Sequence, residues 1–299
     1  MPAFTFRQIV CLLLITLLWG LNWPVMKLGV SVFPPLTFRM VSLWMAVPVL
    51  ALVVWQQKAP WTVPRAAWPA LGKLTLTNML LWHGLMITAM PLLSSGRAAI
   101  LAYTMPIISA MLGAALFGDR LKGRAWVGVG AAAAGVLLLL WHEVAAMGSR
   151  PVGVLLMLGA AASWALGTQW LRRTALPVPL ITVTFWMVLC TAVMMTLLSV
   201  GLEIKRWQWP SSQAWLSITY NGLLGIGFAQ AAWFFLARTL PPLASTLSVM
   251  FVPVIGVFSG AVWLGEVLHW QDAVAVGLMV LAIGSVLLPE RRAKKEVKG

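Results

Sequence analysis

One histidine lies well inside an apolar stretch of the chain: His83, in the sequence LLWHGLM. An imidazole titrates near neutral pH, and an unsatisfied one is costly in hydrocarbon, so a histidine at this depth can bind a ligand or relay protons. A structural histidine that bonds a neighbouring helix is the alternative, and both stay open. Because His142 and His269 stand at the ends of apolar runs, the histidine spacing predicts neither a metal site nor a cofactor.

Two carboxylates, Asp119 and Glu266, occupy matching places in similar phrases 147 positions apart. They are candidate proton carriers, but each lies just before the next predicted helix, where a carboxylate complements the helix dipole and caps free amides. We therefore expect helix caps that also steady gates at the two ends of the molecule. No apolar run has a carboxylate near its middle, which disfavours an ion-binding acid at depth.

Aromatic and polar side chains recur at helical spacing inside the apolar runs. Trp19 stands one helical turn before Asn22, and Trp164, 145 positions after Trp19, stands one turn before Thr168. Each pair therefore places an indole face beside a polar group. Interhelical hydrogen bonds, worth about 0.6 kcal/mol each, are the alternative role for such polar groups. The predicted ligand-binding wall consists of Trp19, Asn22, Trp82, His83, Tyr103, Trp164, Thr168 and Gln230.

The elements that hold these residues must cross a membrane. Hydrophobic residues make up 61% of the chain and charged residues only 9%, and the mean hydropathy is +0.91. A helix needs roughly 20 residues to cross the hydrocarbon, and every amide at that depth must be satisfied within its own segment. The predicted fold class is all-α, with ten spans near Gln8–Leu28, Pro35–Trp55, Pro69–Met90, Ser94–Leu116, Gly123–Trp141, Val152–Leu171, Leu180–Val200, Ala214–Leu236, Pro242–Leu264 and Trp270–Leu288.

The net charge of +14 does not indicate nucleic acid, because the basic residues are scattered through the gaps between apolar runs. If the N-terminus is cytoplasmic, fifteen of the 21 Lys and Arg residues fall on the cytoplasmic side. This bias predicts that both termini are cytoplasmic. The six residues assigned to the outside are Lys27, Arg39, Arg97, Arg150, Lys205 and Arg206.

The chain repeats itself. The phrase TMPIISAMLGAALFGDRL, residues 104–121, returns as FVPVIGVFSGAVWLGEVL, residues 251–268, with Pro106 matching Pro253. Five spans, an odd number, separate the copies, so the second half must enter the membrane from the opposite side, as in inverted-repeat transporters. We expect two five-helix repeats at residues 1–146 and 147–289 and a basic cytoplasmic tail at 290–299. Pro106 and Pro253 are predicted to form matching kinks that act as hinges.

The sequence resembles the drug/metabolite transporter superfamily, in particular its ten-helix EamA-like members. The stretch LLWGLNWPVMK in the first span and the paired proline-to-acid phrases carry the resemblance. It implies ten helices in two inverted halves around a central cavity, in a bacterial inner membrane. It also implies export of small metabolites, and amino acid exporters are among the relatives.

We therefore expect a secondary transporter that exports an amino acid or a related amphipathic compound by alternating access. A cation or multidrug exporter of the same fold is one alternative. An intramembrane enzyme acting on lipid or isoprenoid substrates is another, but it would need converging acid/base groups that the spans do not offer. The expected partners are the substrate and membrane lipids, with no nucleic acid, in a monomer or weak homodimer.

Overall fold

The computed structural model describes residues 5–119, 123–145, 151–239 and 242–287. The predicted basic tail at 290–299 lies outside these ranges. The described helices form ten rods, five in each half of the chain, and the predicted all-helical fold is confirmed. The first half contains α1 (Phe6–Val32), α2 (Pro35–Gln56), a composite third rod from Arg65 to Leu92, a fourth rod from α5 (Ser95–Ala102) and α6 (Met105–Phe117), and α7 (Gly123–Ala145).

The second half follows the same order. It contains α8 (Val152–Arg173), α9 (Leu180–Glu203), a composite rod of α10 (Ser212–Thr219), η5 (Tyr220–Phe228) and α11 (Ala229–Thr239), α12 (Pro242–Leu264) and α13 (Trp270–Leu287). Because short connections join the five rods of each half, α8 starts at the end of the bundle opposite to the start of α1. The halves are therefore inverted relative to one another.

The third rod of each half carries a π-helical segment. In the first half it is η2 (Thr75–Leu81), between α3 (Trp68–Leu74) and α4 (Trp82–Ala89), and in the second half it is η5. A π-helical turn interrupts the regular hydrogen-bond ladder, and such turns are frequent at functional sites. The inverted repeat thus places a backbone irregularity at the same rod of both halves.

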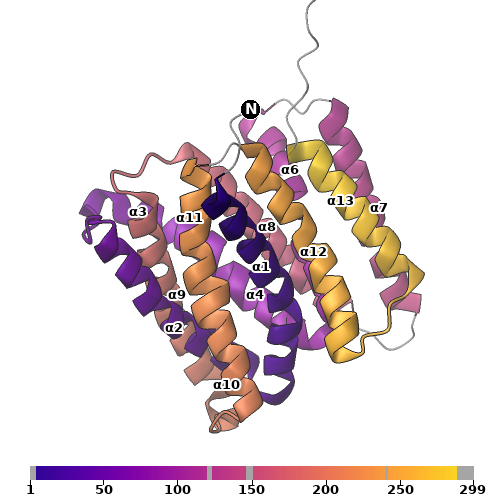
Figure 1. The fold of residues 1–299 in the computed structure, drawn as a ribbon, viewed down its shortest axis with the longest axis horizontal. Helices are drawn as coiled ribbons and strands as arrows, with labels where there is room; N and C mark the ends of the chain where they lie inside the picture. The colour runs from indigo at the N-terminus through magenta and orange to yellow at the C-terminus, as the bar shows by residue number, and fades with distance from the viewer. Residues whose placement is uncertain (1–4, 120–122, 146–150, 240–241, 288–299) are drawn as a thin grey trace, which may run out of the picture.

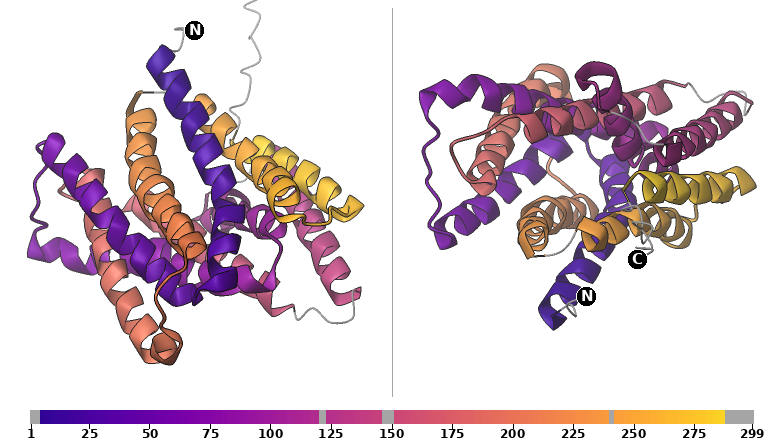
Figure 2. Two further views of the ribbon diagram at one scale, coloured as in Figure 1. Left: turned by 60° about the horizontal axis from the view of Figure 1, so that its bottom comes forward. Right: turned by 90° about the horizontal axis from the view of Figure 1, so that it is seen from above.

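The two halves are interleaved. The most extensive helix pairs are α7 with α13, α2 with α9, α1 with α12, α2 with η5 and α4 with α8, and each pair joins one helix from each half. Figure 1 shows α7 and α13 together at one edge of the bundle and α2 and α9 at the other, and Figure 2 shows the same arrangement from two further sides. The core is consequently shared between the halves.

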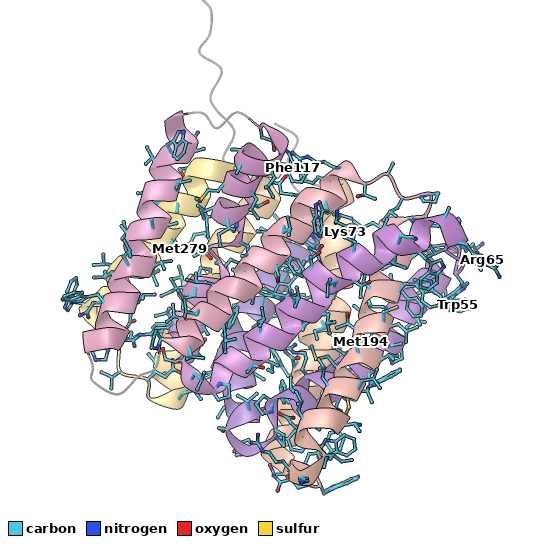
Figure 3. All side chains as sticks on the ribbon, turned by 180° about the vertical axis from the view of Figure 1, so that it is seen from behind. Trp55, Arg65, Lys73, Phe117, Met194 and Met279 are labelled. Carbon is cyan, nitrogen blue, oxygen red and sulfur yellow. The ribbon has the colours of Figure 1, made fainter. Side chains whose placement is uncertain are left out.

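The outer surface of the bundle is apolar. Leu137, Leu197 and Phe258 are each more than 60% exposed, whereas Met279, between the neighbouring helices, is fully buried. Figure 3 shows such outward side chains on the helices, including Trp55 and Met194. Five helical stretches among the described residues have the length and hydropathy needed to cross a membrane: Gln8–Val32, Pro35–Gln56, Ser95–Phe117, Val152–Arg173 and Leu180–Arg206.

Arg39 is the main departure from the predicted layout. The charge count assigned it to the outside, but the structure places it inside α2 with only 1% of its surface exposed, so this assignment is wrong. The local sequence shows a charge near the start of a span, which is typical of an interfacial residue. The acceptor that holds Arg39 inside, Asn221, lies 182 positions away and leaves no local signal.

Candidate functional site

Two tryptophan pairs join the halves inside the bundle. Trp19 on α1 packs on Trp233 of α11 with ring centroids 5.7 Å apart, and Trp82 on α4 packs on Trp164 of α8 at 5.4 Å. These separations are within the range of favourable aromatic contacts. Three of the four are predicted wall residues, and the pairing shows that repeat-related Trp19 and Trp164 each contact the third rod of the opposite half.

Hydrogen bonds reinforce both crossings at the π-helical segments. The Trp19 indole N–H donates to the carbonyl of Gly225 in η5 at 3.1 Å. At the equivalent place, the Asn78 amide of η2 donates to the carbonyl of Trp164 at 3.3 Å. A π-helical turn interrupts the regular hydrogen-bond ladder of a helix and so leaves backbone carbonyls available to other donors. η2 and η5 can therefore form hydrogen bonds with the helix that packs against them.

Asn22 belongs to a polar chain that the sequence did not predict. Its carbonyl oxygen accepts from the amide of Asn221 on η5 at 2.8 Å, and the carbonyl oxygen of Asn221 accepts from Nη1 of Arg39 at 2.9 Å. Asn221 is fully buried, whereas Asn22 is partly exposed. Asn22 therefore presents its own amide N–H groups at the open end of a chain anchored on Arg39.

His83 lies on α4, is 7% exposed, and keeps one ring nitrogen, Nδ1, without a hydrogen-bond partner among the described residues. α4 packs against α2, the helix that carries Arg39. An unpaired ring nitrogen in a buried setting is the mark of a group that can accept or donate a proton toward a bound solute. His83 therefore lies on a helix that neighbours the polar chain of Arg39, Asn221 and Asn22.

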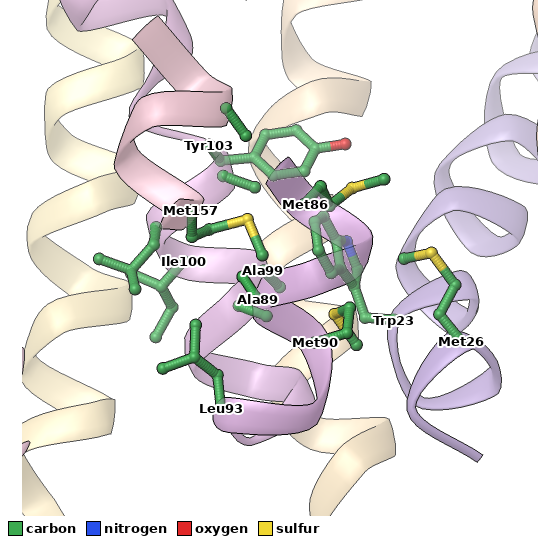
Figure 4. Close-up of a cluster of buried hydrophobic side chains, with 14 of the residues drawn as sticks. Trp23, Met26, Met86, Ala89, Met90, Leu93, Ala99, Ile100, Tyr103 and Met157 are labelled. Carbon is green, nitrogen blue, oxygen red and sulfur yellow. The ribbon is translucent and has the colours of Figure 1, made fainter. Parts of the chain in front are cut away.

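Tyr103 lies at the break between α5 and α6 and is 6% exposed. It borders a cluster of sulfur and aromatic side chains that includes Trp23, Met26, Met86 and Met157 (Figure 4). Methionine side chains adapt to irregular shapes and contact aromatic rings favourably. This part of the predicted wall is therefore apolar and adaptable.

Thr168 and Gln230 contribute less than the sequence suggested. The Thr168 hydroxyl donates to the Trp164 carbonyl of its own helix at 2.9 Å, so this hydroxyl proton is already used. Gln230, at the start of α11, is partly exposed and has no hydrogen-bond partner among the described residues. Their part in a site stays a prediction.

Glu266 lies at one end of the bundle and caps a helix from the other half. Its carboxylate accepts from the backbone N–H of Ser95 at 2.6 Å, from the Ser95 hydroxyl at 2.9 Å and from the N–H of Gly96 at 3.3 Å, all at the start of α5. The expectation that it caps the helix that follows it is therefore wrong. At the start of α13 that role belongs to Asp272, which accepts from the N–H of His269 at 3.0 Å.

Asp119 has a different partner at the opposite end. Its carboxylate accepts from Nη2 of Arg173, at the end of α8, at 2.6 Å, and Nη1 of Arg173 also donates to the Gln169 side chain. Residues 120–122, before α7, lie outside the described residues, so the expected cap there is not seen. The repeat-related acids thus hold different elements: Asp119 a side chain, Glu266 a helix start.

The glycine six residues before each acid has a steric role. A Cβ added at Gly113 would lie 2.6 Å from Oδ2 of Asp119, and one added at Gly260 would lie 2.5 Å from Oε2 of Glu266. At either distance the carboxylate would have to leave its present position to make room for a side chain. The duplicated glycines in the two phrases therefore leave room for the carboxylates to fold back over their own helices.

The two candidate hinge prolines do not lie in equivalent backbone. Pro106 occupies the first turn of α6, after a break at Tyr103 and Thr104, whereas Pro253 lies inside the unbroken helix α12. A proline in a first helical turn sacrifices no hydrogen bond, but an interior proline does. The expectation of matching kinks is thus wrong, and the hinge role itself stays a prediction.

A shallow pocket lies beside Glu266, lined by Arg97 and Asp272 among others. Its charges are already used: Arg97 pairs with Asp272 at 2.9 Å, and Glu266 holds α5. Among the described residues, no group of three His, Cys, Asp or Glu side chains could hold a metal ion. The polar region around Asn22, Arg39 and His83 is therefore the stronger candidate site.

Comparison with known proteins agrees with this architecture. The model of the EamA-like transporter family matches residues 7–141 and, again, residues 151–288. The uncharacterized transporter YoaV of Bacillus subtilis is 27% identical over 90% of this chain and 91% of its own length. The uncharacterized inner membrane transporter YedA of Escherichia coli strain K12 is 28% identical over 95% of this chain and 92% of its own length.

A probable amino-acid metabolite efflux pump of Salmonella typhimurium is 27% identical over 91% of both chains. A solved crystal structure with 23% sequence identity has the same fold, with a TM-score of 0.69 over 96% of this chain and 99% of the other. The two matches of the family model cover both halves. The protein therefore belongs to the EamA-like transporter family of the drug/metabolite transporter superfamily, as a multi-pass membrane transporter and not an enzyme.

Proposed function

We propose that the protein exports a small metabolite, an amino acid or a related amphipathic compound, across a bacterial inner membrane by alternating access. The observation that carries the proposal is the region around Asn22, which lies between the two inverted halves. It combines indole faces with the amide nitrogen of Asn22 and the Nδ1 atom of His83, which have no hydrogen-bond partner among the described residues. An amino acid carries both an apolar part and hydrogen-bonding groups, so it matches such a surface.

Two of the matched relatives support the proposed substrate class, since probable amino-acid metabolite efflux pumps occur in Escherichia coli and Salmonella typhimurium. Export by a cation-selective transporter of the same fold is the second candidate, favoured by the tryptophan faces, which attract cations. The two candidates differ in the charge that the substrate must carry.

We also propose that both termini are cytoplasmic. With Arg39 fully buried in the bundle, the basic residues assigned to the outside fall from six to five, so the bias toward the cytoplasm grows. The proposed partners are the transported solute and membrane lipids, with no nucleic acid, and the protein is proposed to be a monomer or weak homodimer. Light scattering of the detergent-solubilised protein measures this last property.

Efflux from proteoliposomes tests the function. Purified protein is reconstituted, the vesicles are loaded separately with amino acids, nucleosides and cationic drugs, and efflux is measured with and without a pH gradient. We expect efflux of at least one amino acid above that of empty vesicles. Efflux of cationic drugs alone would favour the cation exporter, and no efflux of any solute would count against export.

Two variants sharpen the test. Trp19→Ala removes an indole that joins the halves, whereas Trp209→Ala removes one that is 85% exposed. We expect the first to lose efflux and the second to keep it. If efflux follows the pH gradient in the wild type but not in His83→Gln, His83 carries the coupling; efflux that ignores the gradient indicates facilitated movement.

A further inference from the structure

Arg39 is the largest fully buried side chain in the described structure. It lies in the second turn of α2 with 1% of its surface exposed. A guanidinium stays protonated in proteins, and moving a charge out of water costs several kcal/mol or more unless partners compensate it. A lone cation at this place therefore calls for an explanation.

The protein partners of Arg39 carry no charge. Nη1 donates to the carbonyl oxygen of Asn221 at 2.9 Å, and Nη2 donates to the thioether sulfur of Met26 at 2.9 Å. Nε has no partner among the described residues. A thioether is a weak acceptor. Nη2 of Arg39 therefore has only a weak hydrogen bond, and Nε has none among the described residues.

Four carboxylates have side chains that the structure describes, and all four are engaged elsewhere. Asp119 pairs with Arg173, Asp272 pairs with Arg97, and Glu266 caps α5. Glu203 caps the start of α2, where it accepts from the N–H groups of Leu36 at 3.2 Å and Thr37 at 2.8 Å. Arg39 thus has no counter-ion among the side chains that the structure describes.

The pattern of used and unused donors has a geometric meaning. In a guanidinium, Nε–H and one N–H of Nη2 point along the same edge and form a fork that fits the two oxygens of a carboxylate. In Arg39, the hydrogen bond from Nη1 to Asn221 fixes the guanidinium. The Nε–Nη2 edge contacts only the thioether sulfur of Met26 and has no other partner among the described residues. The fork is held in place and lacks its natural acceptor.

The same region offers further donors. Asn221 links Arg39 to Asn22, whose own amide nitrogen has no partner among the described residues and whose side chain is partly exposed. An ionised carboxylate accepts hydrogen bonds and donates none, so it complements this set of groups.

We propose that Arg39 is the anion-binding group of the transport site and receives the carboxylate of the transported solute on its Nε–Nη2 edge, in place of Met26. The proposal rests on the proposed function and narrows its substrate class to carboxylates. The methionine gives way at low cost because its side chain is flexible. A buried positive charge also repels cations, which sets this site against a cation exporter.

Binding and transport are tested separately with full-length protein in detergent and in proteoliposomes. The binding probe is benzoate compared with benzamide, which has the same shape without the charge, and the readout is the shift of the unfolding temperature. The transport probes are L-leucine and L-phenylalanine compared with their carboxamides. We expect the acids to bind with roughly tenfold or more higher affinity than the amides, as read from the ligand concentration needed to shift the unfolding temperature. We expect the acids to be transported at least roughly tenfold faster, because a paired charge is lost in the amides.

Four variants identify the group responsible. Arg39→Gln should abolish the preference for acids, and Arg39→Lys should keep part of it, because a lysine has the charge without the fork. Asn221→Asp gives Arg39 an internal counter-ion, so it should fold normally and still lose acid binding. Arg65→Gln removes a guanidinium from an exposed site outside the region and should leave the preference unchanged.

The outcomes separate the two proposals. Equal treatment of acids and amides by the wild type, or a full preference for acids in Asn221→Asp, would overturn the role of Arg39. If Arg39→Gln does not fold, Asn221→Asp and the wild-type comparison decide. If benzoate binds through Arg39 but no amino acid moves, the anion site stands and amino acid export is wrong.

Discussion

Gly118 and Gly265, at the ends of the two repeated phrases, are the described glycines with positive φ angles, +70° and +64°. A side chain in this conformation costs about 1–2 kcal/mol. We expect Gly118→Ala and Gly265→Ala each to lower stability by that amount, measured by the unfolding midpoint of the purified protein. Gly201→Ala, in α9, has open space and an ordinary φ, and should be neutral or stabilising by up to about 1 kcal/mol.

Glu266 contributes through its charge. Both oxygens accept from N–H or O–H donors at the start of α5, and a glutamine would turn an N–H₂ group toward one set of these donors. We expect Glu266→Gln to lose about 1.5–3 kcal/mol of stability and to change the rate of efflux, because α5 is held from the other half. Unchanged protein level together with unchanged transport would rule out a structural and a gating role alike.

The fourth rod of each half shows how a duplicated sequence can adopt two backbones. In the first half it breaks at Tyr103 and Thr104 into α5 and α6, and in the second half it is the single helix α12. Alternating access requires the halves to exchange conformations. The difference between these two rods is the kind of asymmetry that such an exchange would interconvert.

Replacing the prolines distinguishes a hinge from a packing element. Pro253→Ala restores a hydrogen bond inside α12 and should raise stability, by up to about 3 kcal/mol, whereas Pro106→Ala, in the first turn of α6, should change stability little. We expect both variants to slow efflux while the folded protein is retained in the membrane. Parallel loss of folded protein and of efflux would show that the prolines serve folding only.

At the scale of the whole molecule, orientation in the membrane follows from charge. We expect a fluorescent protein fused to the C-terminus to be fluorescent in bacterial cells and an alkaline phosphatase fused there to be inactive, since both report a cytoplasmic end. As a control, a phosphatase fused in the loop before α8, near Arg150, should be active. The reverse pattern would invert the proposed topology and the direction of transport drawn from it.

Much of the fold follows from the sequence. The apolar runs predict the rods closely, from Pro35–Trp55 for α2 to Pro242–Leu264 for α12, because backbone amides in hydrocarbon must bond within their own helix. The predicted wall residues Trp19, Trp82 and Trp164 lie inside the bundle in two cross-half pairs, and their role in a wall stays a prediction. The same reasoning missed Arg39, because a charge near a helix start is typical of an interfacial residue, and it left Asn221 out of the predicted wall.

The sequence by itself determined the number of rods, their class and the inverted duplication, because hydrophobic length and repeat offset are properties of the local chain. The tertiary structure alone decided the partners. The Trp19 indole donates a hydrogen bond to Gly225, 206 residues away in the sequence, and Glu266 caps a helix that begins 171 residues before it. Such contacts depend on which faces meet after the halves interleave, and no local pattern encodes that meeting.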